Sequence, residues 1–538
     1  MIAVVAEPSD YPVVREFFEL FKTPWELYQK GRSYDVLLCA GALDYNAADA
    51  KLILLYSSHG LALDAVHGIK IAGRRERSVL CHYELRIPIS GSFLTFQGET
   101  DGQRLLAEDT REAASWSYSS SKGLVERIGY DLLDEIRTLL TVGQPAQYAG
   151  IPTLEVHIAL LRELIVSAGV VLVEIPPVPA GYRFIACLTH DVDHPSIRRH
   201  KLDHTALGFL ARATFGSIKG FLNGSCSIRD VLTNWAAALR LPLVHLGLAE
   251  DFWSDFGERY RRVEKDSSST YFVLPFKNRP GKGQHGNAPD YRASRYGAQD
   301  IADSIKSLVI AGSEIGLHGI DAWVDGSSGR EEIKEIRDLT GSPEVGVRMH
   351  WLYFDKHSAA KLESAGAAFD STVGYREVVG FRAGTTQVYK PFDAERLLEL
   401  PMHVMDTALF YPAYMGLRPK EASELLRRIT DQVDEFGGCL TINWHDRSLA
   451  PERLWCECYF RLLKDLKTRG AWFATAGQAV AWFRKRRSAQ FDCHSAALRP
   501  QLQDTCRSDD CDVLGLEVRA LPAQSLVRHL RAGRDCPN

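Results

Sequence analysis

One run of residues constrains the fold of this chain more than any other: FIACLTHDVDH, which spans residues 184–194. An uninterrupted apolar stretch of this length is typical of a buried strand in a parallel sheet. It ends in His190, Asp191, Asp193 and His194. These groups need partners, because an unpaired buried charge is very costly. Strand ends of this kind hold metals and catalytic acids in α/β folds, so the run predicts a metal-dependent enzyme.

Length and composition narrow the class of protein. A chain of 538 residues is too long for one ordinary core, so two or three domains are expected. The formal net charge of −4 gives no reason to expect nucleic acid as a partner. The eleven cysteines show no framework spacing, which suits a reduced cytoplasm. No signal peptide or uncharged run of about 20 residues is recognised, so we expect a cytoplasmic protein without a transmembrane segment. The sequence does not determine the oligomeric state.

The first 180 residues predict an accessory α/β domain of sandwich-like character. Strand-like runs cover residues 1–6, 34–41 and 51–57, and amphipathic helices are predicted over 123–141 and 154–169. Glu7-Pro8-Ser9 stands after the first strand, where a nucleotide-binding loop would need a glycine cluster. No chemistry is therefore assigned to this domain.

A proline-rich boundary at 173–183 precedes a region, 181–487, in which strands and helices alternate. This alternation predicts a distorted (β/α) barrel of seven or eight strands. The predicted strands begin with 184–189 and continue with 269–276, 313–319, 345–351, 397–404, 439–445 and 471–476.

Two segments of this second half stand apart from the strand and helix alternation. Residues 195–268 are expected to be a helical insertion that caps the barrel mouth. Packing of its basic helix on the barrel is favoured over contact with a membrane or a lipid-linked sugar. Residues 488–538 lose periodicity and are expected to form a poorly ordered tail.

Three further histidines close predicted strands: His318 in SEIGLH, His350 in VGVRMH and His445 in CLTINWH. Parallel barrel topology would gather them at one mouth. An aspartate, two histidines and a water form a standard catalytic zinc site, and a second carboxylate can serve as base. Asp191 and Asp193 point to the same side of their strand, so one can bind metal while the other accepts a proton.

The motifs THDVD, EIGLHG, GFRAG and INWHD resemble, in order, those of the polysaccharide deacetylase superfamily (NodB-homology, carbohydrate esterase family 4). The resemblance covers roughly 184–482 and is closest to a subgroup with an HDVD motif and an extra N-terminal domain. It implies a distorted (β/α) barrel that removes N-acetyl groups from amino sugars. The implied cofactor is Zn²⁺ or another divalent transition metal. The implied substrates are polysaccharides or surface-glycan precursors.

The resemblance also implies roles for individual residues. Asp191 would be the catalytic base, and Asp193 and His318 would be metal ligands. Arg382 in GFRAG would orient Asp191 and keep it ionised. His445 would be the general acid that protonates the leaving amine.

One departure from the family concerns the third metal ligand. The usual histidine four residues after His318 is replaced by Ala322. His350 is the favoured substitute, and His194 is the alternative. Without either, the protein would be a non-catalytic carbohydrate-binding or assembly protein. A related C–N hydrolase acting on a small cyclic amide or ureide is a further alternative.

Overall fold

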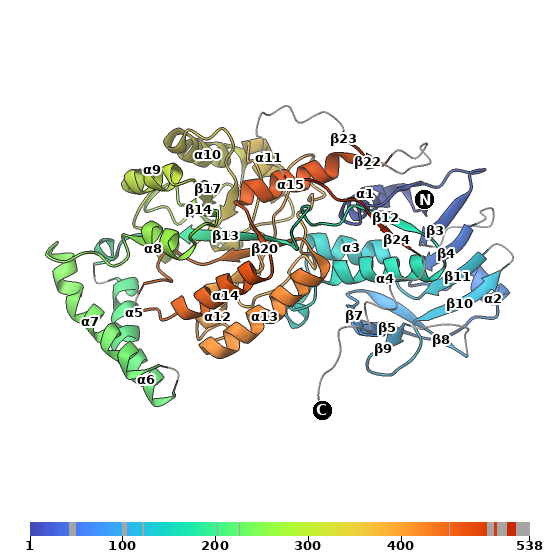
Figure 1. Cartoon of the computed structure of the whole chain (residues 1–538), viewed down its shortest axis with the longest axis horizontal. Helices are drawn as coiled ribbons and strands as arrows, with labels where there is room; N and C mark the ends of the chain where they lie inside the picture. Colours follow the sequence, from blue (N-terminus) through green and yellow to red (C-terminus); the bar gives the residue numbers. More distant parts are fainter. Residues whose placement is uncertain are drawn as a thin grey trace. The chain divides into compact units, whose positions relative to one another are not determined.

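The computed structural model describes residues 1–41, 50–98, 105–120, 123–201, 203–224, 226–450, 452–491, 500–502 and 514–522. Contacts divide the chain into two compact units (Figure 1). Unit 1 comprises Met1–Ala180, Arg382–Thr385 and Phe483–Asn538, and unit 2 comprises Gly181–Phe381 and Thr386–Trp482. Much of the tail expected over 488–538 lies outside the described residues.

Unit 1 is built on a six-stranded sheet in the order β10-β11-β4-β3-β1-β2. All neighbouring pairs are parallel except β10 with β11. The strands are β1 (Ile2–Val5), β2 (Trp25–Leu27), β3 (Tyr34–Ala40), β4 (Ala50–Tyr56), β10 (Ser115–Ser120) and β11 (Gly123–Ile128). The two central strands β3 and β4 are almost wholly buried, as their continuous apolar sequences predict.

The other elements of unit 1 are helices and short antiparallel pairs. The helices are α1 (Tyr11–Leu20), α2 (Ala62–Val66), α3 (Leu132–Thr141) and α4 (Thr153–Ser167). The described part of the unit has four small antiparallel groups: β5 (Lys70–Glu76) with β8 (Ser92–Gln97); β6 (Val79–His82) with β7 (Leu85–Pro88) and β9 (Leu106–Ala107); β12 (Leu172–Glu174) with β24 (Arg519–Leu521); and β22 (Ala489–Phe491) with β23 (Pro500–Leu502).

The helix predicted over 123–141 is wrong in its first part. Residues Gly123–Ile128 form strand β11, and only Leu132–Thr141 is helical. The strand is stabilised by pairing with β4 on one side and β10 on the other, which a sequence window does not reveal. Asp131 marks the true helix start, because its side chain accepts hydrogen bonds from the Leu133 and Asp134 N–H groups.

Unit 2 contains a curled, fully parallel sheet in the order β18-β17-β14-β13-β20-β19, with β21 also pairing with β13. The strands are β13 (Ile185–Val192), β14 (Ser269–Val273), β17 (Glu314–Gly319), β18 (Val347–Met349), β19 (Val404–Met405), β20 (Cys439–Asn443) and β21 (Trp472–Phe473). Single parallel bridges from Val347 to Asp370 and from Asp370 to Glu399 continue the pairing beyond β18. This curled sheet is consistent with the predicted distorted barrel.

Helices surround this sheet (Figure 1). They are α9 (Ala302–Ile310), α10 (Gly326–Thr340), α11 (Ser358–Ala365), α12 (Asp406–Phe410), α13 (Pro419–Phe436) and α14 (Cys456–Thr468). The last helix, α15 (Ala476–Ser488), begins in unit 2 and continues into unit 1. Strand β13 is buried along its whole length within the core of unit 2, which explains its uninterrupted apolar sequence.

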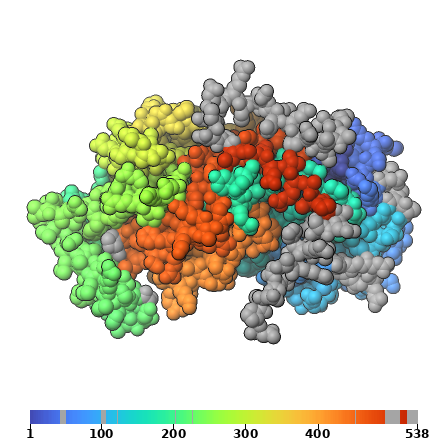
Figure 2. All heavy atoms as spheres, viewed as in Figure 1, coloured from blue at the N-terminus to red at the C-terminus, as the bar shows by residue number. Residues whose placement is uncertain are grey.

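The segment between β13 and β14 is helical, as expected. It contains α5 (His204–Ala211), a π-helical turn (Arg212–Gly216), α6 (Ser217–Leu222), α7 (Ile228–His245) and α8 (Phe256–Val263). Helices α5, α6 and α7 project from the rest of unit 2 as an arm, drawn in green in Figure 2. Within the residues that the structure describes, no helix combines the length and apolar character needed to cross a bilayer.

Candidate metal centre and active site

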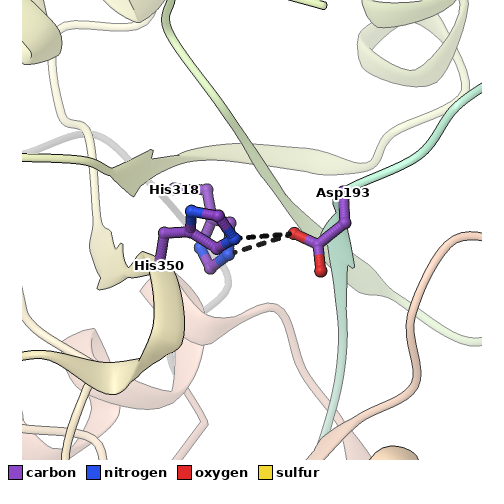
Figure 3. A group of neighbouring side chains, drawn as sticks. All are labelled: Asp193, His318 and His350. Atoms are coloured by element: carbon purple, nitrogen blue, oxygen red, sulfur yellow. Dashed lines mark ion pairs between the residues drawn. The ribbon is translucent and has the colours of Figure 1, made fainter. Parts of the chain in front are cut away.

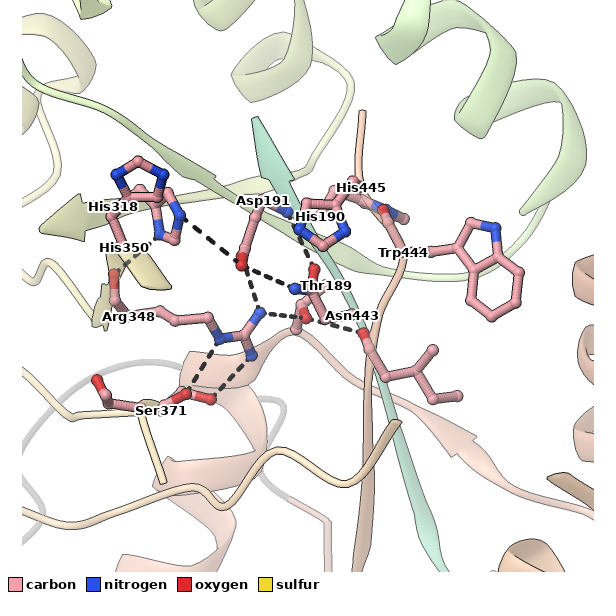
Figure 4. Close-up of polar contacts among 12 residues, drawn as sticks. Thr189, His190, Asp191, His318, Arg348, His350, Ser371, Asn443, Trp444 and His445 are labelled. Atoms are coloured by element: carbon pink, nitrogen blue, oxygen red, sulfur yellow. Dashed lines mark hydrogen bonds and ion pairs between the residues drawn. The ribbon is translucent and has the colours of Figure 1, made fainter. Parts of the chain in front are cut away.

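The side chains predicted from the strand ends meet at one edge of the unit 2 sheet. Asp191 is the penultimate residue of β13, and Asp193 follows that strand directly. His318 lies in β17, His350 follows β18, and His445 lies two residues beyond β20. Because all these strands run in the same direction, their carboxyl ends bring the side chains together (Figure 4).

Asp193, His318 and His350 form a group that could hold a metal ion, since their ligand atoms all lie within 4.8 Å of one another. Asp193 Oδ1 is 3.4 Å from His318 Nε2 and 3.8 Å from His350 Nε2 (Figure 3). Oδ1 is buried and has no hydrogen-bond partner within the described part of the chain. Ligand atoms about 2.0–2.1 Å from a tetrahedral zinc ion lie roughly 3.3 Å apart. The three residues therefore fit a divalent metal, which would satisfy the orphaned oxygen.

A backbone contact sets the tautomer of His318. Its Nδ1 lies 3.0 Å from the carbonyl oxygen of Arg348. A carbonyl only accepts hydrogen bonds, so Nδ1 carries the proton and donates it. The lone pair is then on Nε2, the atom that faces Asp193. Metal-binding histidines are oriented in the same manner.

The charge states of the group also suit metal binding. Burial lowers the pKa of His350 well below its ordinary value, so this imidazole is neutral near pH 7. Burial alone would raise the pKa of Asp193, but His318, His350 and His445 hold it well below its usual value. A carboxylate and neutral imidazoles are the forms that bind metal ions.

Asp191 is held by donors from two other strands of the sheet, β18 and β20. Arg348 Nη1 donates to its Oδ1 at 3.0 Å, and Asn443 Nδ2 donates to its Oδ2 at 2.7 Å (Figure 4). Arg348 is completely buried. The carboxylate lies beside the metal group, with Oδ2 3.9 Å from His318 Nε2. It is placed to accept a proton from a water at that group.

The guanidinium that pairs with Asp191 is therefore that of Arg348, where the resemblance implied Arg382. Arg382 belongs to unit 1, and its carbonyl accepts a hydrogen bond from the Gln144 N–H at 2.8 Å. Sequence reasoning missed Arg348 although a signal was present. An arginine inside the apolar run VGVRM can be buried only with a partner, which makes it a candidate for an ion pair.

His445 is held by a second residue that sequence reasoning missed, Asp406. The carboxylate of Asp406 is 2.6 Å from His445 Nδ1 and also accepts the His445 backbone N–H at 2.8 Å. Burial alone would lower the pKa of His445, but Asp406, Asp193 and Asp191 raise it to about 10. His445 is therefore an imidazolium whose Nε2 lies 3.7 Å from Asp193 Oδ2. Asp406 directly follows β19, so the same strand-end rule could have found it.

The structure also locates the alternative ligand positions. His194 Nδ1 lies 3.1 Å from His200 Nε2. Among the described residues, the metal-binding group contains His350 and not His194. Ala322 is completely buried in the apolar core of unit 2. The third ligand, His350, comes from the neighbouring strand end instead of from this position.

Asp191, His445 and the metal group line one cavity of about 440 Å³. This volume is within the range of small-molecule sites. The cavity wall also carries the aromatic side chains of Tyr291, Trp351, Tyr411, Tyr414 and Trp455. Such rings offer apolar faces to a ligand while their polar edges remain available for hydrogen bonds.

Comparisons with known proteins give weak matches only. No model of a known protein family matches this chain, and no curated protein matches it. A solved structure from Mycobacterium smegmatis, assigned as a polysaccharide deacetylase, is 19% identical. The match covers 58% of this chain and 95% of that one, with a TM-score of 0.35.

Two further solved structures are similar at the same level. The PuuE allantoinase is 16% identical over 58% of this chain and 93% of its own, with a TM-score of 0.35. A family 4 acetyl xylan esterase from Clostridium thermocellum, in complex with a cobalt ion, is 13% identical over 55% of this chain and 90% of its own, with a TM-score of 0.25. Because these TM-scores are below 0.5, any functional conclusion has to rest on the side chains of this chain.

Proposed function

We propose that this protein is a metal-dependent hydrolase that removes the N-acetyl group from an amino sugar in a polysaccharide or surface-glycan precursor. The observation that carries the proposal is the arrangement around Asp193. A three-residue metal group stands between a held carboxylate, Asp191, and a cationic imidazole, His445. Amide hydrolysis needs this combination of a base, an electrophile and an acid.

The residues of the chain divide the reaction as follows. A divalent metal, with zinc the proposed ion, would be held by Asp193, His318 and His350, and would polarise the acyl carbonyl and acidify a water. Asp191 accepts the proton of the attacking water, with its orientation set by Arg348 and Asn443. His445 donates a proton to the leaving nitrogen, which is otherwise a very poor leaving group.

Three observations favour this function over its rivals. A second imidazole, His350, completes the metal group, which is unexpected in a non-catalytic relative whose site has decayed. The aromatic wall of the cavity suits the faces of sugar rings better than a small, strongly polar cyclic ureide. The Asp406–His445 pair supplies a proton donor, which a purely binding protein does not require.

The test combines metal analysis with an acetate-release assay. Purified wild type should hold about one divalent ion per chain and release acetate from N-acetylglucosamine oligomers. Asp193→Ala and His350→Ala should each lose metal and activity together. His285→Ala is the matched control, because this histidine is exposed and lies outside the cavity.

The outcomes separate the rival functions. A wild type that binds no divalent metal, or a His350→Ala variant with normal metal content, would contradict the proposed centre. Hydrolysis of a cyclic ureide such as allantoin, without acetate release from any amino sugar, would show that the protein is a cyclic amidase and not a deacetylase.

A further inference from the structure

One arginine of the cavity, Arg453, has no hydrogen-bond partner among the described residues. Arg453 is 5% exposed, and its Nε, Nη1 and Nη2 atoms are buried without a hydrogen-bond partner in the described structure. Its guanidinium carbon lies 4.9 Å from the centre of the Trp455 ring and 5.7 Å from that of Tyr411. The rings hold the cation in the cavity wall while its N–H groups make no bond.

Other buried arginines of unit 2 show how unusual this is. Arg292 lines the same cavity and donates to the carbonyl oxygens of Pro280, Ile320 and His350. Arg348 is paired with Asp191. Burying a charge without such partners is strongly unfavourable, so a group other than the protein is the expected partner of Arg453.

A second guanidinium and a phenol lie beside Arg453. Arg447 also lines the cavity, and its Nη2 donates to Tyr411 Oη at 3.4 Å. Among the described residues, neither guanidinium forms a salt bridge, and the carboxyl of Glu452 is held by Trp253 Nε1 at 2.7 Å. The cavity thus carries two cations that no carboxylate pairs with directly.

The electrostatic effect of this pair is visible at Tyr411. Burial alone would raise the pKa of its phenol, but Arg453, Arg447, His445 and Arg212 lower it to about 7. The positive field is therefore strong enough to stabilise a negative charge inside the cavity.

We propose that Arg453, Arg447 and Tyr411 bind a phosphate group on the substrate. Two guanidinium forks match a phosphate dianion in charge and geometry, whereas a carboxylate would neutralise only one of them. This inference rests on the proposed function, since the phosphate and the metal group share one cavity. It narrows the substrate to an N-acetylated amino sugar that bears a phosphate ester or diphosphate.

The first test measures binding of inorganic pyrophosphate to the metal-loaded protein by calorimetry. Arg453→Met should weaken binding about tenfold or more, because it removes charge-assisted hydrogen bonds but keeps an apolar contact with Trp455. Arg453→Lys should lose less of the pyrophosphate affinity, because it keeps the positive charge. Arg461→Met is the matched control: it makes the same charge change at an exposed position on α14 and should bind as wild type does.

Melting temperatures, measured with and without pyrophosphate, show whether each variant is folded and whether it binds the ligand. Pyrophosphate should raise the melting temperature of wild type and of Arg461→Met, but not that of Arg453→Met. The series is repeated in Asp193→Ala, where pyrophosphate cannot be bound through a metal. Pyrophosphate binding that is equal in wild type and Arg453→Met, or that disappears in Asp193→Ala, would overturn the site.

The second test separates this inference from the proposed function. N-acetylglucosamine 1-phosphate should bind more tightly than N-acetylglucosamine and than the carboxylate N-acetylmuramic acid, and Arg453→Met should lose this preference whereas Arg461→Met should keep it. Acetate release without any preference for the phosphate would overturn the phosphate site and leave the deacetylase standing. Phosphate binding that depends on Arg453, without acetate release, would overturn the deacetylase and leave the phosphate site standing.

A different observation, on the helical arm, supports a second inference. Of the 23 exposed large apolar side chains in the described part of the chain, 12 lie between residues 207 and 248. Five of them recur at three- and four-residue spacing along one face of α7, and Leu246 continues the spacing directly after the helix: Ile228, Leu232, Trp235, Leu239, Leu243 and Leu246. The opposite face of α7 packs into the arm's own core, so this outer face has no partner among the described residues.

The charges on the arm have one predominant sign. Residues 204–249 contain four Lys and Arg residues and one Asp, a formal charge of +3 in a chain of −4. Lys219, Arg229 and Arg240 are exposed. An apolar face flanked by cations is typical of helices that lie in the interface of an anionic bilayer. Two copies of the arm packed face to face would instead bring like charges together.

We infer that the outer face of α7 binds an anionic lipid surface. Sedimentation with phosphatidylcholine vesicles containing about 30 mol% phosphatidylglycerol should pull down wild type, whereas pure phosphatidylcholine should retain much less. Leu239→Glu should weaken binding about tenfold or more. Ile310→Glu, a matched change at an exposed residue of α9, should leave binding unchanged.

Light scattering measures the oligomeric state and so tests whether a second copy of the chain covers this face instead. Wild type that does not bind the anionic vesicles, or that binds equally to neutral ones, would overturn the lipid assignment. A dimer in solution that Leu239→Glu dissociates would assign the face to a second copy of the chain.

Discussion

Units 1 and 2 each contain a mainly parallel sheet, but the polar groups at the strand ends are used differently. At the end of β11 in unit 1, the buried Arg127 donates to Asp64 and to the carbonyl oxygens of Ser57, His59 and Ile128. Every donor group of this side chain has a partner, so its position serves folding. The contrast with unit 2 shows that topology alone does not make a site.

In unit 2 the buried polar groups are only partly satisfied. Among the described residues, Asp193 Oδ1 has no hydrogen-bond partner, and Arg453 has none on any guanidinium nitrogen. Unit 1 also buries polar atoms without a partner, such as Tyr56 Oη and His82 Nδ1, so an unpartnered atom alone does not mark a site. Unit 2 differs because its unpartnered carboxylate and guanidinium line one cavity, where a ligand or ion can complete them. Substitutions in both units can test that distinction.

The largest effect should come from Asp191→Asn. The amide keeps the shape of the side chain but accepts protons poorly, so turnover should fall by about three orders of magnitude or more. Metal content, measured by mass spectrometry, should stay close to wild type because Asp191 is not a ligand. Activity within tenfold of wild type would remove Asp191 from the role of base.

Arg127→Met tests the structural side of the comparison. Removing one partner of a buried ion pair should cost about 3–5 kcal/mol of unfolding free energy, because Asp64 is left without its cation. Urea unfolding measures the loss. The molecules that remain folded should keep their metal. Loss of metal from folded molecules would show that Arg127 affects the metal centre as well as the stability of the fold.

Asp406→Asn should reduce turnover by about a hundredfold. The Asp406 carboxylate raises the pKa of His445, and His445 must be protonated to act as an acid. The alkaline limb of the rate profile should therefore move to lower pH in the variant. A fall in rate without any change in the pH profile would indicate that Asp406 merely supports the fold.

The smallest effect concerns a buried carboxyl pair in unit 2 that does not line the cavity. Burial raises the pKa of Glu399, and the neighbouring Asp370 raises it further. The folded state thus keeps a proton that the unfolded chain releases above its ordinary pKa of 4.5, so stability should decline as pH rises from there. Glu399→Gln should flatten this slope in urea titrations, and the exposed Glu331→Gln should not.

Much of the site was predictable because it follows one rule, that chemistry gathers at the carboxyl ends of parallel strands. The rule predicts that Asp193, His318 and His350 lie together, and their ligand atoms do form one group. Arg348 was missed because the family resemblance directed attention to Arg382. Asp406 was missed because it lies two residues beyond the strand predicted at 397–404 and outside the four family motifs, and β19 ends only at Met405.

The failures in the fold have a related cause. The error over 123–141 arose because apolar residues of a strand and of the helix that follows it happened to share a helical spacing. Long-range pairing decided the outcome, and a local window contains no record of it. Arg453 could not have been recognised either, since the lack of a partner is visible only when every neighbour is known.

The position of the third metal ligand, His350, has a mechanical consequence. A ligand set drawn from a single loop would leave the sheet unaffected by the metal, but here the ligands come from β13, β17 and β18. A bound ion would cross-link the ends of these strands, joining Asp193 to His350, 157 positions further along the chain. Metal loading should therefore slow amide hydrogen exchange along β17 and β18, so that the protein becomes more rigid when it becomes competent for chemistry.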